Sequence, residues 1–456
     1  MRTQFRFLLA SVIVILSASF TSPAQSKLEL TLKQTASISS VEKLESSVFP
    51  EKYLLHVTRP VNPEAAGEMA PGMQTYVKYA DKAVRAADAG TFDQRVIVCH
   101  AGFDRPTLLV TEGYWASYAL NPRYQEELSR LFNCNIVVVE YRYFGESTPK
   151  DCDWRYLTVA NSLCDLHHVV GMLKPVYPGK WISTGISKGG QTTMFYRAYY
   201  PDDVDISVPY VAPLNKSVED GRHEPFLSDL VGTAEERAEI ESFMMEIVKN
   251  RDVYFPMFRK HCDAKGYTFR VPLEEIFDLT VMELRYSMWQ SGVPASSIPA
   301  ADASAEEKFS YFIKQCEPDY FSRQSPYYSF DIMAAKELGY YGYDIRPFRK
   351  YMSIKNTKDY LRRVMLDSPD DKLKFDSTLY RHVRSFLKKN DPKMIYIYGG
   401  TDPWGSSGVC TWLDTSGKDN LKVYVKPRGS HATRIGSFDA PVRDEIMATL
   451  TKWLEE

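Results

Sequence analysis

The 456-residue sequence lacks the marks of several large classes of protein. It has no excess of charge of one sign, because 56 Lys and Arg nearly balance 58 Asp and Glu, for a formal net charge of −2. A chain without a basic field has little to attract nucleic acid, so we expect no nucleic-acid partner. It also contains no internal repeat and no low-complexity tract, which argues against repeat architectures.

Metal-binding patterns are absent as well. The seven cysteines include no C-x-x-C pair, and no His/Cys cluster indicates a metal site. Their number is odd, so at least one thiol stays free or pairs outside the chain. Cys99 and Cys134 lie in or beside apolar runs and are expected to be buried thiols. Cys152–Cys164 and Cys262–Cys316 are candidate disulfides.

Beyond its first 24 residues the chain has no long uncharged apolar run. Arg2 and Arg6 precede an apolar stretch, Phe7–Leu16, that is too short to span a bilayer comfortably. The small residues of Ser22–Pro23–Ala24 follow it, which is the pattern of a cleaved signal peptide. We therefore expect a mature chain that begins near Gln25, is secreted or periplasmic, and has no membrane anchor.

The rest of the composition is that of a globular protein, with 44% hydrophobic and 25% charged residues. The chain is long enough to bury a large core. Aromatic residues make up 13%, including 30 tyrosines, which is a high share. Aromatic side chains line substrate clefts and pack cores equally well, so both uses stay open.

Short apolar runs that are typical of buried strands alternate with stretches of helical pattern. The predicted strands are 53–57, a segment near Tyr76, 95–99, 107–111, 136–140, 181–184, 204–211, 394–398 and 421–425. The predicted helices are 121–131, 157–173, 191–200 and 442–454. Nearly continuous apolar strands predict the α/β class, with a mostly parallel sheet that is covered on both faces.

Between the seventh and eighth of these strand regions the character changes. Residues 216–389 are richer in charge and aromatics and are mostly helical in pattern, for example over 233–249, 273–290 and 305–315. We therefore predict a signal peptide (1–24), a first core part (25–215), a helical cap (216–389) and a second core part (390–456). Residues 28–50 are polar and poorly patterned, and we expect them to form a loosely attached lead-in.

One short motif carries most of the chemistry. Gly185-Ile-Ser187-Lys-Gly189 follows a predicted strand and precedes a predicted helix, which is the context of a nucleophile elbow. The glycines are needed because the turn is strained and brings the strand and helix backbones close together. Ser187 is the predicted nucleophile.

A serine nucleophile needs a base, and the base needs an orienting carboxylate. In this arrangement the acid and the histidine follow the serine in the chain, each after a late strand. Asp402 follows the strand 394–398, and His431 follows the strand 421–425. The remaining histidines fit less well, since His167 and His168 lie in a helix before the serine.

An oxyanion hole needs two N–H donors. The first is the backbone N–H of Lys188, the residue after the serine, and the second comes from a loop after an earlier strand. Gly113–Tyr114, after the strand 107–111, is the natural source, and we expect the Tyr114 N–H to be the donor. The Lys188 side chain is not well placed to be the base, because His431 fills that role.

At these motifs the sequence resembles the bacterial secreted prolyl tri-/tetrapeptidyl aminopeptidase family. The matching segments are 100–106, 111–114, the elbow with Lys188, 402–404 and 429–431. It is more distantly similar to the lysosomal Pro-Xaa carboxypeptidase and dipeptidyl peptidase II group, through 140–147, 156–158 and 402–404. Both resemblances imply an α/β-hydrolase fold. The distant group has an aromatic residue where this chain has Lys188, and the cap is too divergent to carry over.

The resemblance implies a serine exopeptidase that releases short, tripeptide-like peptides from free N-termini through an acyl-enzyme, with proline near the cleaved bond and no cofactor. Such an enzyme needs a carboxylate to bind the substrate ammonium. Glu112 is one candidate, and Glu219, Asp220 and Glu224 at the cap entrance are others. Trp404 either walls a proline pocket or packs under the acid loop.

The loop that contains Arg142 and Glu146 follows a central predicted strand. Arg142 and Glu146 either position the substrate or form an internal ion pair that holds their loop, and we expect the ion pair. A Pro-specific carboxypeptidase or an esterase of the same fold remains an alternative, as does a catalytically silent binding protein. The sequence contains no indication of the oligomeric state.

Overall fold

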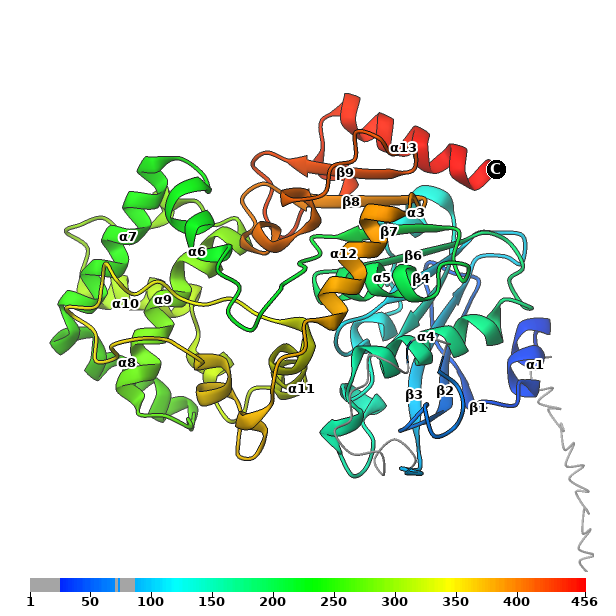
Figure 1. Cartoon of the computed structure of the whole chain (residues 1–456), viewed down its shortest axis with the longest axis horizontal. Coiled ribbons are helices and arrows are strands. Elements are labelled where there is room, and N and C mark those ends of the chain that lie inside the picture. Colours follow the sequence, from blue (N-terminus) through cyan, green and yellow to red (C-terminus); the bar gives the residue numbers. More distant parts are fainter. Residues whose placement is uncertain (1–24, 70–72, 74–86) are drawn as a thin grey trace, which may run out of the picture.

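The computed structural model describes residues 25–69, 73 and 87–456, and its centre is a nine-stranded sheet (Figure 1). The strands are β1 (Ile38–Lys43), β2 (Glu51–Pro60), β3 (Thr91–His100), β4 (Thr107–Thr111), β5 (Asn135–Val139), β6 (Trp181–Ile186), β7 (Ile206–Tyr210), β8 (Met394–Gly399) and β9 (Leu421–Lys426). Their order is β1-β2-β3-β5-β4-β6-β7-β8-β9. From β5 to β9 all neighbours are parallel, which confirms the mostly parallel sheet.

Helices cover both faces of the sheet, as the continuous apolar strands predict. On one face, α3 (Glu127–Phe132) and α13 (Ala440–Glu455) pack on strand residues such as Ile97 and Val138. On the other face, α4 (Val159–Leu173), α5 (Lys188–Tyr199) and α12 (Thr378–Lys389) pack on Val98 and Val139, the next residues along the same two strands. Successive side chains of a strand thus enter opposite layers, because they point to opposite faces.

The segment between β7 and β8 is mainly helical and lies largely to one side of the sheet (Figure 1). Its α-helices are α6 (His223–Pro225), α7 (Ala234–Lys249), α8 (Arg251–Lys265), α9 (Leu273–Ser291), α10 (Ala305–Gln315) and α11 (Tyr328–Met333). Thr233 begins α7 with a capping box, in which its side chain accepts from the Glu236 N–H. The helix α12 lies within the residues expected for the cap but packs on α5 of the sheet layer.

The predicted lead-in is wrong. Residues 27–34 form α1 (Lys27–Gln34), which buries Leu28 and Leu32, and β1 pairs antiparallel with β2 at the edge of the sheet. The apolar pattern is weak because α1 buries one short stripe and β1 leaves both faces largely exposed.

The predicted helix over 121–131 is also largely wrong. The short 3-10 turn η2 (Ser117–Leu120) ends just before this stretch, and α3 begins only at Glu127. Asn121 precedes a proline, which disfavours the helical region, and it is extended with φ −54° and ψ 129°.

All seven cysteines are free, so the candidate disulfides Cys152–Cys164 and Cys262–Cys316 are not formed. Cys99 and Cys134 are buried, as expected. No helix among the described residues is long and apolar enough to cross a membrane. The expected signal peptide and the predicted strand near Tyr76 lie outside the described residues.

Candidate active site

Ser187 stands at a sharp turn between β6 and α5. The helix begins directly after it, at Lys188, three residues earlier than the sequence pattern indicates. Ser187 itself adopts φ 58° and ψ −119°, a strained conformation for a residue with a side chain. A Cβ on Gly185 would lie 2.4 Å from the carbonyl carbon of Gly189, and one on Gly189 would lie 2.8 Å from the Thr111 oxygen. The elbow can therefore form only with glycine at both positions.

Asp402 and His431 are brought together by the loops after β8 and β9. The Thr401 N–H donates to the Gly429 oxygen at 2.9 Å, and a Cβ on Gly399 would meet the Ser430 oxygen at 2.3 Å. His431 Nδ1 donates to Asp402 Oδ2 at 2.7 Å, and the Asp402 side chain is fully buried. This contact leaves Nε2 as the nitrogen available for proton transfer.

The three candidate catalytic residues follow β6, β8 and β9, which run parallel in one part of the sheet. Their side chains therefore belong to the same edge, where the carboxyl ends of the strands meet. Among the described residues no hydrogen bond joins His431 to Ser187. Catalytic hydrogen bonds often tighten only when substrate is bound.

The loop after β4 passes beside the start of α5. A Cβ on Gly113 would lie 2.6 Å from the Cβ of Lys188, so the two segments are in direct contact. The Gly113 N–H donates to Glu112 Oε2 at 3.3 Å and is not free. The Tyr114 N–H has no acceptor among the described residues, and the Lys188 N–H, as the first of a helix, has no intrahelical acceptor.

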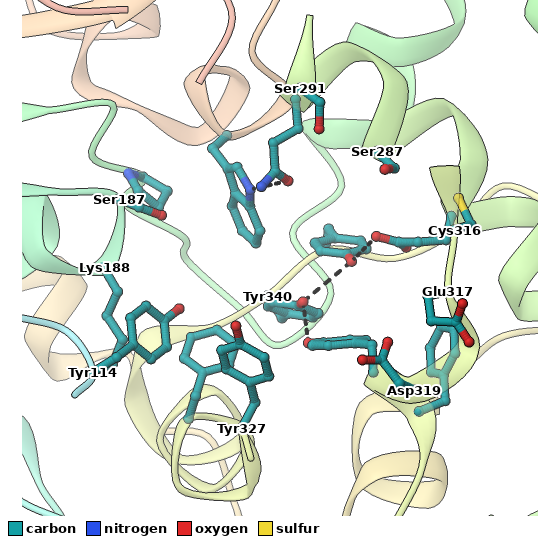
Figure 2. Close-up of a pocket in the computed structure, with 18 of the residues that line it drawn as sticks. Tyr114, Ser187, Lys188, Ser287, Ser291, Cys316, Glu317, Asp319, Tyr327 and Tyr340 are labelled. Carbon is teal, nitrogen blue, oxygen red and sulfur yellow. Dashed lines mark hydrogen bonds between the residues drawn. The ribbon is translucent and has the colours of Figure 1, made fainter. Parts of the chain in front are cut away.

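Ser187 opens into a cavity of about 570 Å³ between the sheet edge and the helical segment. Figure 2 shows Ser187, Lys188 and Tyr114 on one side of it and Glu317 and Asp319 on the other. Aromatic rings form much of the wall between them: Tyr114, Trp115, Tyr320, Tyr327, Phe330, Tyr340, Tyr341 and Trp404. A part of the aromatic surplus therefore lines the cavity.

Glu112 and Trp404 line this cavity, but Glu224 does not. Burial raises the pKa of Glu112 to about 7, although a hydrogen bond from the Tyr118 hydroxyl opposes the shift. Trp404 contacts the rings of Tyr340 and Tyr341, and its Nε1 donates to Gln290 Oε1 at 3.0 Å.

The other acidic candidates, Asp220 and Glu219, have protein partners. Asp220 forms an ion pair with Arg222, and hydrogen bonds from Arg222 lower the pKa of Asp220 against the raising effect of burial. Glu219 accepts the N–H of Asp359. Neither residue lines the cavity.

The sequence reasoning missed Glu283, which lines the cavity from α9. The hydroxyl of Tyr341 donates to its Oε1 at 2.8 Å and that of Tyr343 to its Oε2 at 2.5 Å. Burial raises the pKa of Glu283 to about 7. A carboxylate between Met282 and Leu284 in a helix with many apolar positions is a signal that could have indicated it.

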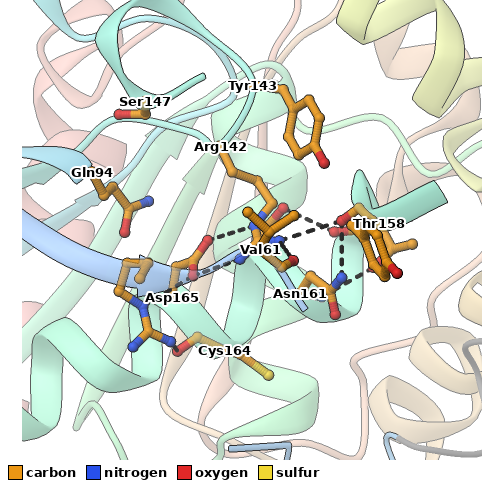
Figure 3. A network of polar contacts seen from close by, with 12 residues as sticks. Val61, Gln94, Arg142, Tyr143, Ser147, Thr158, Asn161, Cys164 and Asp165 are labelled. Atoms are coloured by element: carbon orange, nitrogen blue, oxygen red, sulfur yellow. Dashed lines mark hydrogen bonds and ion pairs between the residues drawn. The ribbon is translucent and has the colours of Figure 1, made fainter. Parts of the chain in front are cut away.

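The expected ion pair between Arg142 and Glu146 is wrong. Arg142 instead donates to both oxygens of Asp165, from Nε at 2.7 Å and from Nη2 at 2.8 Å (Figure 3). Arg59 donates to the same carboxylate at 3.1 Å. Glu146 pairs with Arg95 and His56. A buried guanidinium needs a buried carboxylate, and Asp165 on α4 supplies it, whereas Glu146 is exposed.

Comparison with known proteins shows the family of the chain. The model of the PS-10 peptidase S37 family matches residues 72–453. A prolyl tri/tetrapeptidyl aminopeptidase of Streptomyces mobaraensis is 29% identical over 377 residues, which cover 80% of this chain and 76% of that protein.

Solved structures with similar folds include the proline iminopeptidase of Mycobacterium smegmatis, with a TM-score of 0.39, 12% identity, and coverage of 79% of this chain and 95% of that one. A peroxisomal alpha-beta-hydrolase of Saccharomyces cerevisiae matches with a TM-score of 0.38 and 12% identity. The match covers 91% of this chain and 90% of the yeast chain. The mostly parallel sheet with helices on both faces is the expected α/β architecture. The chain belongs to the PS-10 peptidase S37 family and is a serine peptidase.

Proposed function

We propose that the protein is an exported aminopeptidase that releases short peptides from free N-termini, with proline near the cleaved bond. The observation that carries the chemistry is Ser187 on its elbow, at the same sheet edge as the buried Asp402–His431 pair. The relative from Streptomyces mobaraensis, a prolyl tri/tetrapeptidyl aminopeptidase, supports the substrate class.

In the proposed reaction Ser187 Oγ attacks the peptide carbonyl while His431 Nε2 takes its proton. Asp402 holds the imidazole in the tautomer with a proton on Nδ1 and stabilises the imidazolium that forms. The backbone N–H groups of Lys188 and Tyr114 bind the oxyanion. His431 then protonates the leaving amine, and water hydrolyses the acyl-enzyme by the same steps.

The substrate ammonium is assigned to the far wall of the cavity. Glu112 bonds to the Gly113 N–H beside the proposed oxyanion donor, so it lies close to the reacting carbonyl. Three extended residues span about 10 Å, so a tripeptide amine lies well beyond Glu112. Glu283, which lines the cavity from α9 of the helical segment, is the better candidate, and Trp404, which also lines the cavity, is our candidate for packing on the proline ring.

The test uses one peptide with a free N-terminus and the same peptide N-acetylated, with products identified by mass spectrometry. The free peptide is expected to lose an N-terminal fragment of three or four residues, and the acetylated peptide to be cut far more slowly. Ser187→Ala is expected to abolish both reactions. Equal cleavage of the two peptides would overturn the aminopeptidase assignment, release from the C-terminus would favour a carboxypeptidase, and no cleavage of either peptide would favour an esterase.

Glu283→Gln tests the ammonium site, with Glu275→Gln on the same helix as its control. Glu275 pairs with Arg363 and does not line the cavity. A hydrogen bond to a charged group contributes about 1.5–3 kcal/mol, so Glu283→Gln is expected to lower kcat/KM for the free peptide about 10- to 100-fold. Equal effects of the two variants would exclude Glu283. Export is tested separately by N-terminal sequencing of the protein from the medium or periplasm, with a start near Gln25 expected.

A further inference from the structure

The proposed oxyanion donor Tyr114 N–H belongs to the same peptide unit as the carbonyl of Gly113. A peptide unit is planar, and in its trans form the C=O and N–H point in opposite directions. Any group that holds the Gly113 oxygen therefore also sets the direction of the Tyr114 N–H. The hydrogen-bond partners of the Gly113 oxygen therefore decide whether the Tyr114 N–H points toward the oxyanion.

The Lys188 side chain is the partner of the Gly113 oxygen. Its Nζ donates to that oxygen from a position where the residue is only 2% exposed. Nζ also lies 3.3 Å from the centroid of the Tyr141 ring and 5.4 Å from that of Tyr114. No carboxylate among the described residues forms an ion pair with it. Burying an amino group is costly unless the group is hydrogen-bonded, and the Gly113 oxygen is the acceptor that offsets this cost.

The neighbouring groups of the loop are fixed as well. The Gly113 N–H donates to Glu112, and the Tyr114 carbonyl accepts the Tyr141 N–H at 3.0 Å. The close approach of Gly113 to the Cβ and Cγ of Lys188 leaves no room for a side chain. Every other hydrogen-bonding group of the Gly113 and Tyr114 backbone thus has a partner, and the Tyr114 N–H remains unpaired among the described residues.

We propose that the Lys188 side chain is a positioning residue that aims and polarises the Gly113–Tyr114 peptide, so that its N–H is ready to bind the oxyanion. Lys188 then serves the oxyanion hole twice, with its own backbone N–H and, through its side chain, with the donor on the opposite loop. This inference rests on the proposed serine mechanism, because it needs an oxyanion beside Ser187.

The test is Lys188→Met, which keeps an unbranched side chain, one atom shorter than lysine, and removes the donor. Loss of one oxyanion donor costs about 10²–10³ in kcat, and a misdirected donor loses part of that, so we expect kcat to fall about 10- to 100-fold. KM is expected to stay within about threefold, because the contact acts in the transition state. Affinity for a peptidyl boronate, which forms a tetrahedral adduct on serine, is expected to fall with kcat, while affinity for the product peptide stays constant.

Lys336→Met is the matched control. Lys336 is another lysine whose Nζ donates to backbone carbonyls, those of Trp154 at 2.9 Å and Leu157 at 2.8 Å, and it does not line the cavity. Its loss is expected to reduce stability and leave kcat unchanged. The proposal is overturned if Lys188→Met keeps kcat within threefold, if it changes KM alone, or if Lys336→Met lowers kcat equally.

If Lys188→Met does not fold, Lys188→Gln takes its place. The glutamine amide nitrogen is one atom closer to the backbone than Nζ, so it cannot make the same contact with the Gly113 oxygen. A fall in kcat of at least fivefold is expected, and an unchanged kcat overturns the proposal. Ser187→Ala separates this inference from the mechanism on which it rests. An inactive Ser187→Ala with a fully active Lys188→Met contradicts the role of Lys188 alone, whereas an active Ser187→Ala contradicts both.

Discussion

Asp402→Asn is the substitution whose effect the structure defines most sharply. Asp402 Oδ2 accepts the His431 Nδ1–H at 2.7 Å, and Oδ1 accepts the Trp404 N–H at 3.2 Å. An asparagine has one accepting oxygen and one donating NH₂ group. With its oxygen toward Trp404, its NH₂ faces Nδ1 and forces the proton onto Nε2, so that His431 can no longer take a proton from Ser187.

The opposite orientation keeps the correct tautomer but places the NH₂ group against the Trp404 N–H. A buried donor without an acceptor costs about 1–3 kcal/mol, so the wrong tautomer is favoured by that amount. The carboxylate also stabilises the imidazolium by about 4 kcal/mol at 4 Å and an effective dielectric constant of 20. The two effects together amount to about 5–7 kcal/mol, and we expect kcat to fall at least about 10⁴-fold.

The assay is steady-state hydrolysis of a free N-terminal peptide with a chromogenic leaving group, with folding checked by thermal denaturation. Asp391→Asn is the control, because Asp391 also accepts backbone N–H groups, such as that of Leu421 at 2.9 Å, but lies before β8, at the other end of the strand from Asp402. It is expected to keep kcat. An Asp402→Asn protein with kcat within tenfold of the unsubstituted protein would refute the assigned role of Asp402.

Three further predictions concern pH and stability. The first compares kcat/KM for the free peptide with kcat/KM for the N-acetylated peptide, and the ratio of the two should rise as the pH passes through about 7. The reason is that Glu283, whose pKa is raised to about 7, is neutral below that pH and charged above it. If Glu283→Gln leaves this pH dependence of the ratio unchanged, Glu283 is excluded as its cause. Asp165→Asn should lower the free energy of unfolding by about 3–5 kcal/mol, since it leaves the buried Arg59 and Arg142 without their shared carboxylate, and denaturant titration showing less than 1 kcal/mol would contradict this. Gly185→Ala should destabilise by about 1–3 kcal/mol or more and abolish activity, because its Cβ would lie 2.4 Å from backbone atoms of Gly189; an active, equally stable variant would show that the elbow tolerates a side chain.

The parts of the fold that the sequence predicted are those with strong local patterns. The buried strands β4, β5 and β7 are continuous apolar runs, and the elbow is specified by glycines that its close contacts require. The region of α1 and β1 was missed because an edge strand with exposed faces has almost no apolar pattern. A helix or strand is thus easier to predict from its local sequence pattern when more of it is buried.

Contacts between distant segments were harder to predict. Arg142 and Glu146 are near each other in sequence, yet Arg142 bonds to Asp165 on a later helix. Glu283 reaches the cavity only because the helical segment folds over the sheet edge. Its apolar neighbours in α9 indicate a buried carboxylate, but they do not indicate which site it faces. The candidate catalytic residues could be named because chain order and strand ends constrain them, and Asp402 and His431 do form the expected contact.

The most direct test of the central claim is to identify the residue that a fluorophosphonate modifies. Serine hydrolases react with such probes through their activated nucleophile, so the intact protein is expected to gain one adduct, which peptide mapping by mass spectrometry places on Ser187. Ser187→Ala should gain none, and Asp402→Asn should react much more slowly. An adduct on another residue, or none on a folded protein, would contradict the account.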